Sequence, residues 1–199
     1  FQTFSLGFWI RVGSIYENKL NNGYTHLLEH MLFKGTKKRS YLDISKEIDG
    51  VGGYINAFTE REYTCFYVSL TNHHLNLGTD ILWDMITNST IDQKELDKEK
   101  MVIVEEIKMY EDVPEELVID LLFANMWKNH SLGFPILGSI KNIQNVDRNG
   151  LLDFYSNHYS TDNLVISIAG NFEKTKFLRQ LESLPFTKAN KNGYQSIPS

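Results

Sequence analysis

Several features that define whole classes of protein are scarce or missing in this sequence. Its 199 residues include one cysteine, Cys65, which excludes an internal disulfide framework and fits a reducing compartment. No run of about eighteen apolar residues occurs, so we predict no membrane-spanning segment. Basic residues are not in excess, because 20 Lys and Arg stand against 25 Asp and Glu, a formal net charge of -5. This balance argues against nucleic acid as the main partner.

The chain also lacks an initiator Met and a signal peptide, and it opens on Phe1 inside a strand-like segment. We therefore expect an N-terminally trimmed fragment. What is present is ordinary for a globular protein, with 42% hydrophobic and 23% charged residues. This length is enough to bury a substantial core, as one large domain or two small ones.

Alternation with period two predicts the strands. In 4–12 the apolar residues fall on one side, as in a strand with one buried face. These residues are Phe4, Leu6, Phe8, Ile10 and Val12. Segments 54–59 and 62–70 are joined by two residues, which predicts an antiparallel hairpin. The mostly apolar segment 164–169 is expected to lie centrally in the sheet.

Helical periodicity and capping residues predict the helices. The expected helices are 23–33, 41–49, 75–88, 93–110, 113–129, 147–158 and 173–184. Ser40 and Asp43 form a capping box, and Asp92 and Asp147 cap two later helices. We expect 36–39 to be a solvated loop and 130–145 another loop.

These elements predict an α/β (α+β) fold in which a largely antiparallel sheet packs against several helices. We expect one domain over residues 1–185 and a polar tail or linker over 186–199. The glycine-rich segment 50–53, followed by Asn56 and Ala57, indicates a place where another backbone comes close. A plain surface turn is an equal alternative on these residues alone.

Helix 23–33 carries the chemistry. His26, Glu29 and His30 share one face, because positions i, i+3 and i+4 are neighbours on a helix. Two imidazoles one turn apart can hold Zn²⁺ at about 2.0–2.1 Å, and a nearby carboxylate can take a proton from metal-bound water. The order His-x-x-Glu-His is the inverzincin signature. The alternative is an amphipathic helix whose His and Glu are only surface residues.

A third ligand is predicted from helix 93–110. Glu99 and Glu106 fall within about twenty degrees of each other on its apolar face, whereas Glu105 lies on the lysine-bearing flank. The apolar face is expected to contain Leu96, Val102, Ile103, Ile107, Met109 and Tyr110. A carboxylate in a buried face loses hydration worth several kcal/mol unless a positive charge meets it.

A zinc ion on the two imidazoles is the obvious partner for these carboxylates. We therefore predict Glu106 as the third ligand and Glu99 as an acid that orients a ligand or the bound water. The alternative is that the helix is only partly covered, which would leave both carboxylates at a solvent-exposed edge.

A resemblance to a known family rests on motifs spread from Leu6 to Asn171. The zinc-helix motif continues as Met31-Leu32-Phe33-Lys34-Gly35-Thr36. Further motifs are Gly52-Gly53-Tyr54-Ile55-Asn56-Ala57-Phe58-Thr59, Glu62-Tyr63-Thr64, the stretch 99–109, Gly133 to Gly138, Phe154-Tyr155, Tyr159, Asn163 and Ala169-Gly170-Asn171. Together they resemble the pitrilysin, insulinase and mitochondrial processing peptidase family, in its shorter processing-peptidase-like branch.

The resemblance implies a zinc endopeptidase with the fold of the processing-peptidase half-domain. It implies that His26, His30 and Glu106 bind Zn²⁺ and that Glu29 is the general base. Glu99 matches the family's auxiliary glutamate of the catalytic site.

The resemblance also implies how substrate binds. Asn56 and Ala57 match the edge strand to which a peptide adds as an extra strand. Phe33 matches a position lining the pocket after the scissile bond. The implied substrate is a peptide or an unfolded protein.

The implied partner is a second, homologous domain that is absent from this sequence, in a homodimer or heterodimer. Bacterial wording of the motifs implies a cytoplasmic location, with the mitochondrial matrix as the alternative. Two other functions stay open: a non-catalytic peptide-binding subunit, and an interaction module with a structural zinc or none.

Overall fold

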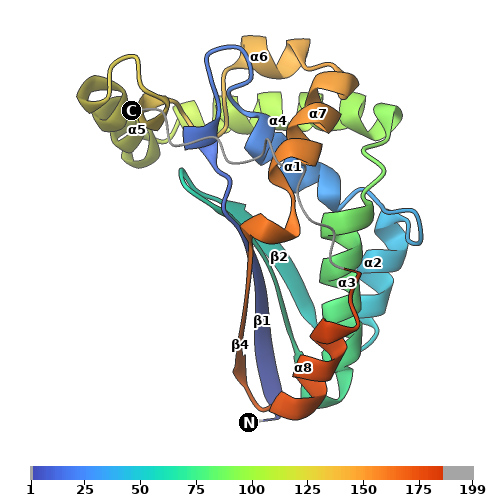
Figure 1. Ribbon diagram of the computed structural model, residues 1–199. Helices are drawn as coiled ribbons and strands as arrows, with labels where there is room; N and C mark the ends of the chain where they lie inside the picture. The colour runs from blue at the N-terminus through green and yellow to red at the C-terminus, as the bar shows by residue number, and fades with distance from the viewer. Residues whose placement is uncertain (1, 186–199) are drawn as a thin grey trace.

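One four-stranded antiparallel sheet organises the protein, and the computed structural model describes residues 2–185 (Figure 1). The strands are β1 (Thr3–Ile10), β2 (Tyr54–Thr59), β3 (Thr64–Thr71) and β4 (Leu164–Gly170), in the order β2-β3-β1-β4. The predicted mixed α/β class with an antiparallel sheet is confirmed. The tail predicted at 186–199 lies outside the described residues.

Strand β1 runs through the middle of the sheet and buries one face. Its alternate residues Phe4, Leu6, Phe8 and Ile10 are buried, as is Val12 just beyond the strand, which confirms the predicted alternation. Helix α3 (Leu75–Asn88) contacts β1 and β3, and Figure 1 shows α2, α3 and α8 along the same face of the sheet.

The predicted hairpin is present, and it places β2 at an edge. Strands β2 and β3 pair antiparallel from Tyr54 opposite Ser69 to Thr59 opposite Thr64. Among the described residues β2 pairs with no other strand. The backbone groups on its outer side are therefore open to a further strand.

The prediction that 164–169 is a central strand is wrong for the described part of the chain. Strand β4 pairs only with β1 there, at the opposite edge from β2. Its apolar run is not buried on both faces, because Val165 is 64% exposed while Ile166 and Ile168 pack against the core. Half-buried and exposed side chains alternate along β4, but most of them are apolar, so the sequence does not show the alternation.

Most predicted helices are present, with shifts of a few residues at their ends. They are α1 (Tyr24–Leu32), α2 (Tyr41–Asp49), α3, α4 (Gln93–Glu111), α5 (Pro114–Met126), α7 (Arg148–His158) and α8 (Lys174–Glu182). The capping box of Ser40 and Asp43 forms, and Asp92 and Asp147 cap α4 and α7. Across residues 2–185, none of the helices has the length and apolar character needed to cross a membrane.

The prediction of a loop over 130–145 is wrong in part. Residues Ile140–Asn145 form the short helix α6, which begins where the Ser139 hydroxyl accepts a hydrogen bond from the amide of Asn142. Ile143 of α6 is fully buried in the core. A six-residue helix with one buried side chain leaves too short a periodic pattern to recognise in sequence.

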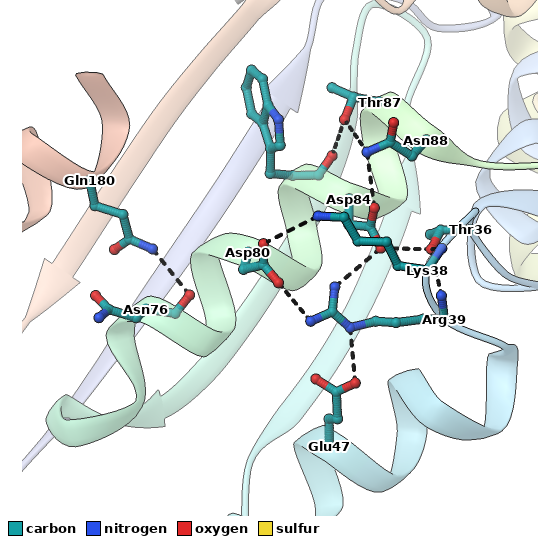
Figure 2. A network of polar contacts seen from close by, with 11 residues as sticks. Thr36, Lys38, Arg39, Glu47, Asn76, Asp80, Asp84, Thr87, Asn88 and Gln180 are labelled. Atoms are coloured by element: carbon teal, nitrogen blue, oxygen red, sulfur yellow. Dashed lines mark hydrogen bonds and ion pairs between the residues drawn. The ribbon is translucent and has the colours of Figure 1, made fainter. Parts of the chain in front are cut away.

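The prediction that the basic segment 36–39 is a solvated loop is wrong. Figure 2 shows the Arg39 guanidinium between helices α2 and α3, where it contacts the carboxylates of Glu47 at 2.9 Å, Asp80 at 2.6 Å and Asp84 at 3.1 Å. The Thr36 hydroxyl donates to Asp84 at 2.6 Å. These contacts, named here the Arg39 cluster, fix the segment after α1 and hold α2 beside α3.

Candidate metal centre

Helix α1 is anchored at its start by Glu17, a residue outside the helix. Gly23, the N-cap, has a φ of +101°, which favours glycine, and it has no side chain to cap the helix. Glu17 accepts hydrogen bonds from the amides of Gly23 at 2.9 Å and Thr25 at 2.7 Å, and from the Asn22 side chain at 2.9 Å. It thereby satisfies backbone donors that a helix start leaves unpaired.

Burial raises the pKa of Glu17 to about 7, although these hydrogen bonds lower it. Glu17 could not be recognised as a cap from the sequence, because it lies outside the usual capping positions and is brought to the helix by the preceding loop.

One face of α1 is core and the other carries the predicted site. Leu27, Leu28, Met31 and Leu32 are fully buried. The His26 and His30 rings project from the other side, with their centroids 4.6 Å apart. Helix α1 packs against α4, which carries the predicted third ligand.

The structure brings His26, His30 and Glu106 together. Glu106 Oε1 lies 3.7 Å from His26 Nε2, and its Oε2 lies 3.6 Å from His30 Nε2. One ligand atom from each residue lies within 4.8 Å of the other two. Atoms that share a tetrahedral zinc at bonds of about 2.0–2.1 Å are about 3.3 Å apart, so small side-chain movements suffice for coordination.

The donor set fits a zinc ion. Two imidazoles and one carboxylate are a ligand set of catalytic zinc sites, which keep a fourth position for water or substrate. Glu106 Oε2 is buried and has no hydrogen-bond partner among the described residues. Buried polar atoms without partners are rare in proteins, and Glu106 Oε2 lies 3.6 Å from His30 Nε2.

The electrostatics favour binding by His26. Burial, and then the neighbouring His30, lower the pKa of His26 to about 3. Its ring is therefore neutral, which is the form that binds metals. Burial, and then Glu99, raise the pKa of Glu106, although His30 lowers it. A cation between these groups would stabilise the ionised form of the Glu106 carboxylate.

Glu106 is less buried than the sequence predicted. Its side chain is 42% exposed, whereas that of Glu99 is 6% exposed. The apolar face of α4 is narrower than expected, because Val102 and Met109 are 50% and 70% exposed. The inference from a buried carboxylate therefore holds for Glu99, and Glu106 lies at the solvent-exposed edge that was the alternative. Glu105, predicted to be a surface residue, is exposed and pairs with Lys108 at 2.6 Å.

Glu99 lies beside His30 and not among the three converging atoms. Its Oε2 is 3.1 Å from His30 Nδ1, and its Oε1 is 2.6 Å from Lys34 Nζ. Burial raises the pKa of Glu99, but hydrogen bonds from His30 and Lys34 outweigh burial and hold it below its usual value. An ionised Glu99 accepts the Nδ1 proton of His30, which leaves Nε2 free to bind a metal. The sequence analysis missed Lys34.

Glu29 contacts strand β2 and lines a cavity together with His26, one of the candidate ligands. Its Oε2 accepts a hydrogen bond from the Thr59 hydroxyl at 2.5 Å. Burial is the main reason that the pKa of Glu29 is raised, as expected of a carboxylate that takes up and releases a proton. Thr59 ends the motif that begins at Gly52, but only the packing of β2 against α1 shows that its partner is Glu29.

Two cavities meet at Glu29. The larger, of about 570 Å³, is lined by Glu29 and His30 together with Phe33 and Asn56. The smaller, of about 290 Å³, is lined by Glu29 and His26 together with Ala57. Strand β2 borders both cavities. Asn56 and Phe33 line the larger one beside His30, and Ala57 lines the smaller one beside His26.

Comparison with curated proteins gives several relatives. The chain is 44% identical over 178 residues to the uncharacterized zinc protease YmxG of Bacillus subtilis, which covers 89% of this chain and 43% of that protein. It is 42% identical over 176 residues to the mitochondrial-processing peptidase subunit beta of Bos taurus, and this match covers 88% of this chain and 36% of that protein. The chain thus spans less than half the length of these relatives.

Solved structures agree on the fold. A protease from Helicobacter pylori superposes with a TM-score of 0.89 at 22% identity, over 100% of this chain and 48% of that one. An M16-like peptidase from Alicyclobacillus acidocaldarius superposes with a TM-score of 0.84 at 23% identity, over 94% of this chain and 46% of that one.

Two family profiles match the chain. Residues 145–198 match the profile of the peptidase M16 inactive domain. Residues 2–140, well over half of the chain, match the profile of insulinase, peptidase family M16. The chain therefore belongs to the insulinase family, peptidase family M16.

Proposed function

We propose that this protein is a zinc endopeptidase in which His26, His30 and Glu106 bind the metal. The observation that carries the proposal is the convergence of one ligand atom from each residue within 4.8 Å, beside Glu29. Family membership and the names of the relatives support a peptidase. When bound, zinc supplies a Lewis acid that polarises the peptide carbonyl and makes water a better nucleophile at neutral pH.

Glu29 is the proposed general base. It accepts a proton from the attacking water and passes it to the leaving amine, so its carboxylate cycles between two protonation states. The Thr59 hydroxyl holds Oε2 of Glu29, which leaves Oε1 for the water. Glu99 holds the His30 ring by its Nδ1 side.

The proposed substrate is an extended peptide or an unfolded segment. It pairs with the open edge of β2 at Asn56 and Ala57, which aligns its backbone past Glu29. Phe33 forms an apolar part of the larger cavity, into which a side chain next to the scissile bond would point. The amide of Ala57 donates to Asn56 Oδ1 at 2.9 Å, and an added strand would have to exchange this bond.

A second homologous domain, in the same polypeptide or in a partner subunit, is proposed to cover the substrate from the other side. The support is that the relatives are more than twice as long as the matched region. Without such a domain, we expect zinc binding with weak cleavage.

The test combines zinc analysis with a peptide-cleavage assay on the whole protein. We expect one zinc per chain, cleavage that a chelator abolishes, and a loss of about 10²–10⁴-fold in turnover for Glu29→Gln with zinc retained. Glu105→Gln, on the same molecule but exposed and paired with Lys108, is the matched control. Full turnover by Glu29→Gln would remove Glu29 from this role, and zinc binding without any cleavage would favour a peptide-binding subunit.

A further inference from the structure

Lys34 and Glu99 form an ion pair beside the proposed ligands. Lys34 Nζ lies 2.6 Å from Oε1 of Glu99, while Oε2 of the same carboxylate lies 3.1 Å from His30 Nδ1. One carboxylate is therefore divided between a lysine and a ring that faces Glu106. The Lys34 side chain is 29% exposed and that of Glu99 is 6% exposed, so the lysine reaches the acid from the side of the solvent.

Helical spacing produces this arrangement. His26, His30 and Lys34 are four residues apart, so they form one line along α1 and just beyond its end. Glu99 and Glu106 are two turns apart on α4. Because Glu106 meets His26 and His30 while Glu99 meets His30 and Lys34, the two lines run in opposite directions and interlock at His30.

The charges give Lys34 a task that His30 cannot perform. A carboxylate as buried as Glu99 requires a positively charged partner. A histidine that binds zinc through Nε2 is neutral and offers only one N–H. Among residues 2–185, the ion pairs of Glu99 are with His30 and Lys34 alone, so Lys34 supplies the full positive charge.

We infer that Lys34 is a positioning residue of the metal centre, which fixes the Glu99 carboxylate so that it holds His30 with Nε2 directed at the metal. The inference rests on the proposed function, because it takes His30 as a zinc ligand. Lys34 also lines the larger cavity, where it could instead contact substrate directly, and the experiment separates these two roles.

The experiment measures the zinc dissociation constant by competition with a chromophoric chelator. We expect Lys34→Met to weaken zinc binding about 10-fold, the lower end of the effect of losing an outer-shell partner. Lys34→Arg should restore affinity close to wild type, because it keeps the charge. Lys38→Met is the matched control: this lysine lies four residues further on, is exposed, and forms a single ion pair within residues 2–185, at 4.0 Å from Asp80.

A double variant tests the path through Glu99. If Lys34 acts through this carboxylate, Lys34→Met combined with Glu99→Gln should bind zinc no more weakly than Glu99→Gln alone. Additive losses would overturn the inference, as would unchanged zinc affinity in Lys34→Met, whether thermal stability falls or only KM rises. A wild-type protein that binds no zinc would overturn the proposed function and this inference together.

Discussion

Two clusters of charged side chains lie near α1, and they differ in what they leave unpaired. In the Arg39 cluster every carboxylate has a partner. The Asp84 carboxylate accepts three hydrogen bonds, from Thr36 and Arg39 on one oxygen and from Asn88 on the other. At the proposed metal centre, by contrast, Glu106 Oε2 is buried without any hydrogen-bond partner among the described residues.

The difference separates structure from function in physical terms. A polar cluster with all its hydrogen bonds made rigidifies the fold, and it has no capacity left for a ligand. A cluster with unpaired buried atoms costs stability, which a bound cation restores. Both clusters combine basic side chains or imidazoles with carboxylates, so composition alone cannot tell them apart.

The strongest test of the comparison removes the centre of the Arg39 cluster. Arg39→Met leaves the buried Asp84 without its cation, and we expect the free energy of unfolding to fall by about 3–4 kcal/mol, since Glu47 and Asp80 are partly exposed. Denaturant unfolding of the metal-free protein measures it. The zinc affinity of the folded variant should not change, and a large loss of affinity would contradict the separation of the two clusters.

Glu17 sharpens the comparison, because it is a buried carboxylate with hydrogen bonds and no ion-pair partner among the described residues. Burial raises its pKa from 4.5 to about 7, so the folded state binds this proton more tightly than the unfolded state. The Glu17 contribution to stability is therefore fully present below pH 4.5 and is lost as the pH rises to about 7.

A shift of this size corresponds to about 3 kcal/mol. We expect the difference in unfolding free energy between wild type and Glu17→Gln to change by about that amount between pH 4.5 and pH 7.5. A difference independent of pH would mean that Glu17 is ionised throughout this range.

At the proposed metal centre we expect the opposite pattern, with a change in zinc affinity and none in the stability of the metal-free protein. Glu106→Gln should weaken zinc binding about 100-fold, or about 2.7 kcal/mol, which is the upper end for an outer-shell change and a low value for a lost ligand. The metal-free protein should keep its stability, because the substitution removes a charge near Glu99. Glu105→Gln is the control for zinc affinity. A destabilised metal-free Glu106→Gln protein would make this cluster structural, like the Arg39 cluster.

The smallest expected effect concerns Glu29, the proposed general base. Thr59→Val removes the hydrogen bond to Glu29 but keeps the shape of the side chain, and we expect kcat to fall about 10-fold with zinc affinity unchanged. Steady-state kinetics on a peptide substrate measures it, with Thr71→Val at the end of β3 as the control. An effect on KM alone would assign Thr59 to substrate binding.

Much of the fold could be predicted from local patterns. Capping residues and periodicity located α2, α3, α4 and α7, and alternation located β1 and the β2–β3 hairpin. Patterns failed where burial depends on distant segments. Segment 164–169 is apolar enough for a central strand, yet the described chain covers only one of its faces. Val102 and Met109 are apolar by residue type, but the described chain leaves 50% of Val102 and 70% of Met109 exposed.

The site followed the same division. His26, Glu29 and His30 share a face of α1 because of the 3.6-residue repeat, which any helix over these residues would impose. Glu99 and Glu106 lie more than sixty residues away and were predicted only from their place on the apolar face of a second helix. Lys34 was not recognised, although its spacing from His30 is visible in the sequence.

The sequence by itself determined most of the helices, the four strands and the helical face that carries two imidazoles and a carboxylate, because these depend on interactions between near neighbours in the chain. The sequence predicted that Glu106 meets the imidazoles and that Glu99 lies behind a ligand. Only the tertiary structure decided how deeply each carboxylate is buried, and showed that Glu17 anchors the start of α1, that Lys34 pairs with Glu99 and that Thr59 holds Glu29. The reason is that packing α1 against α4 and β2 sets distances of a few ångströms between residues far apart in sequence, and charge and hydrogen bonding act over those distances.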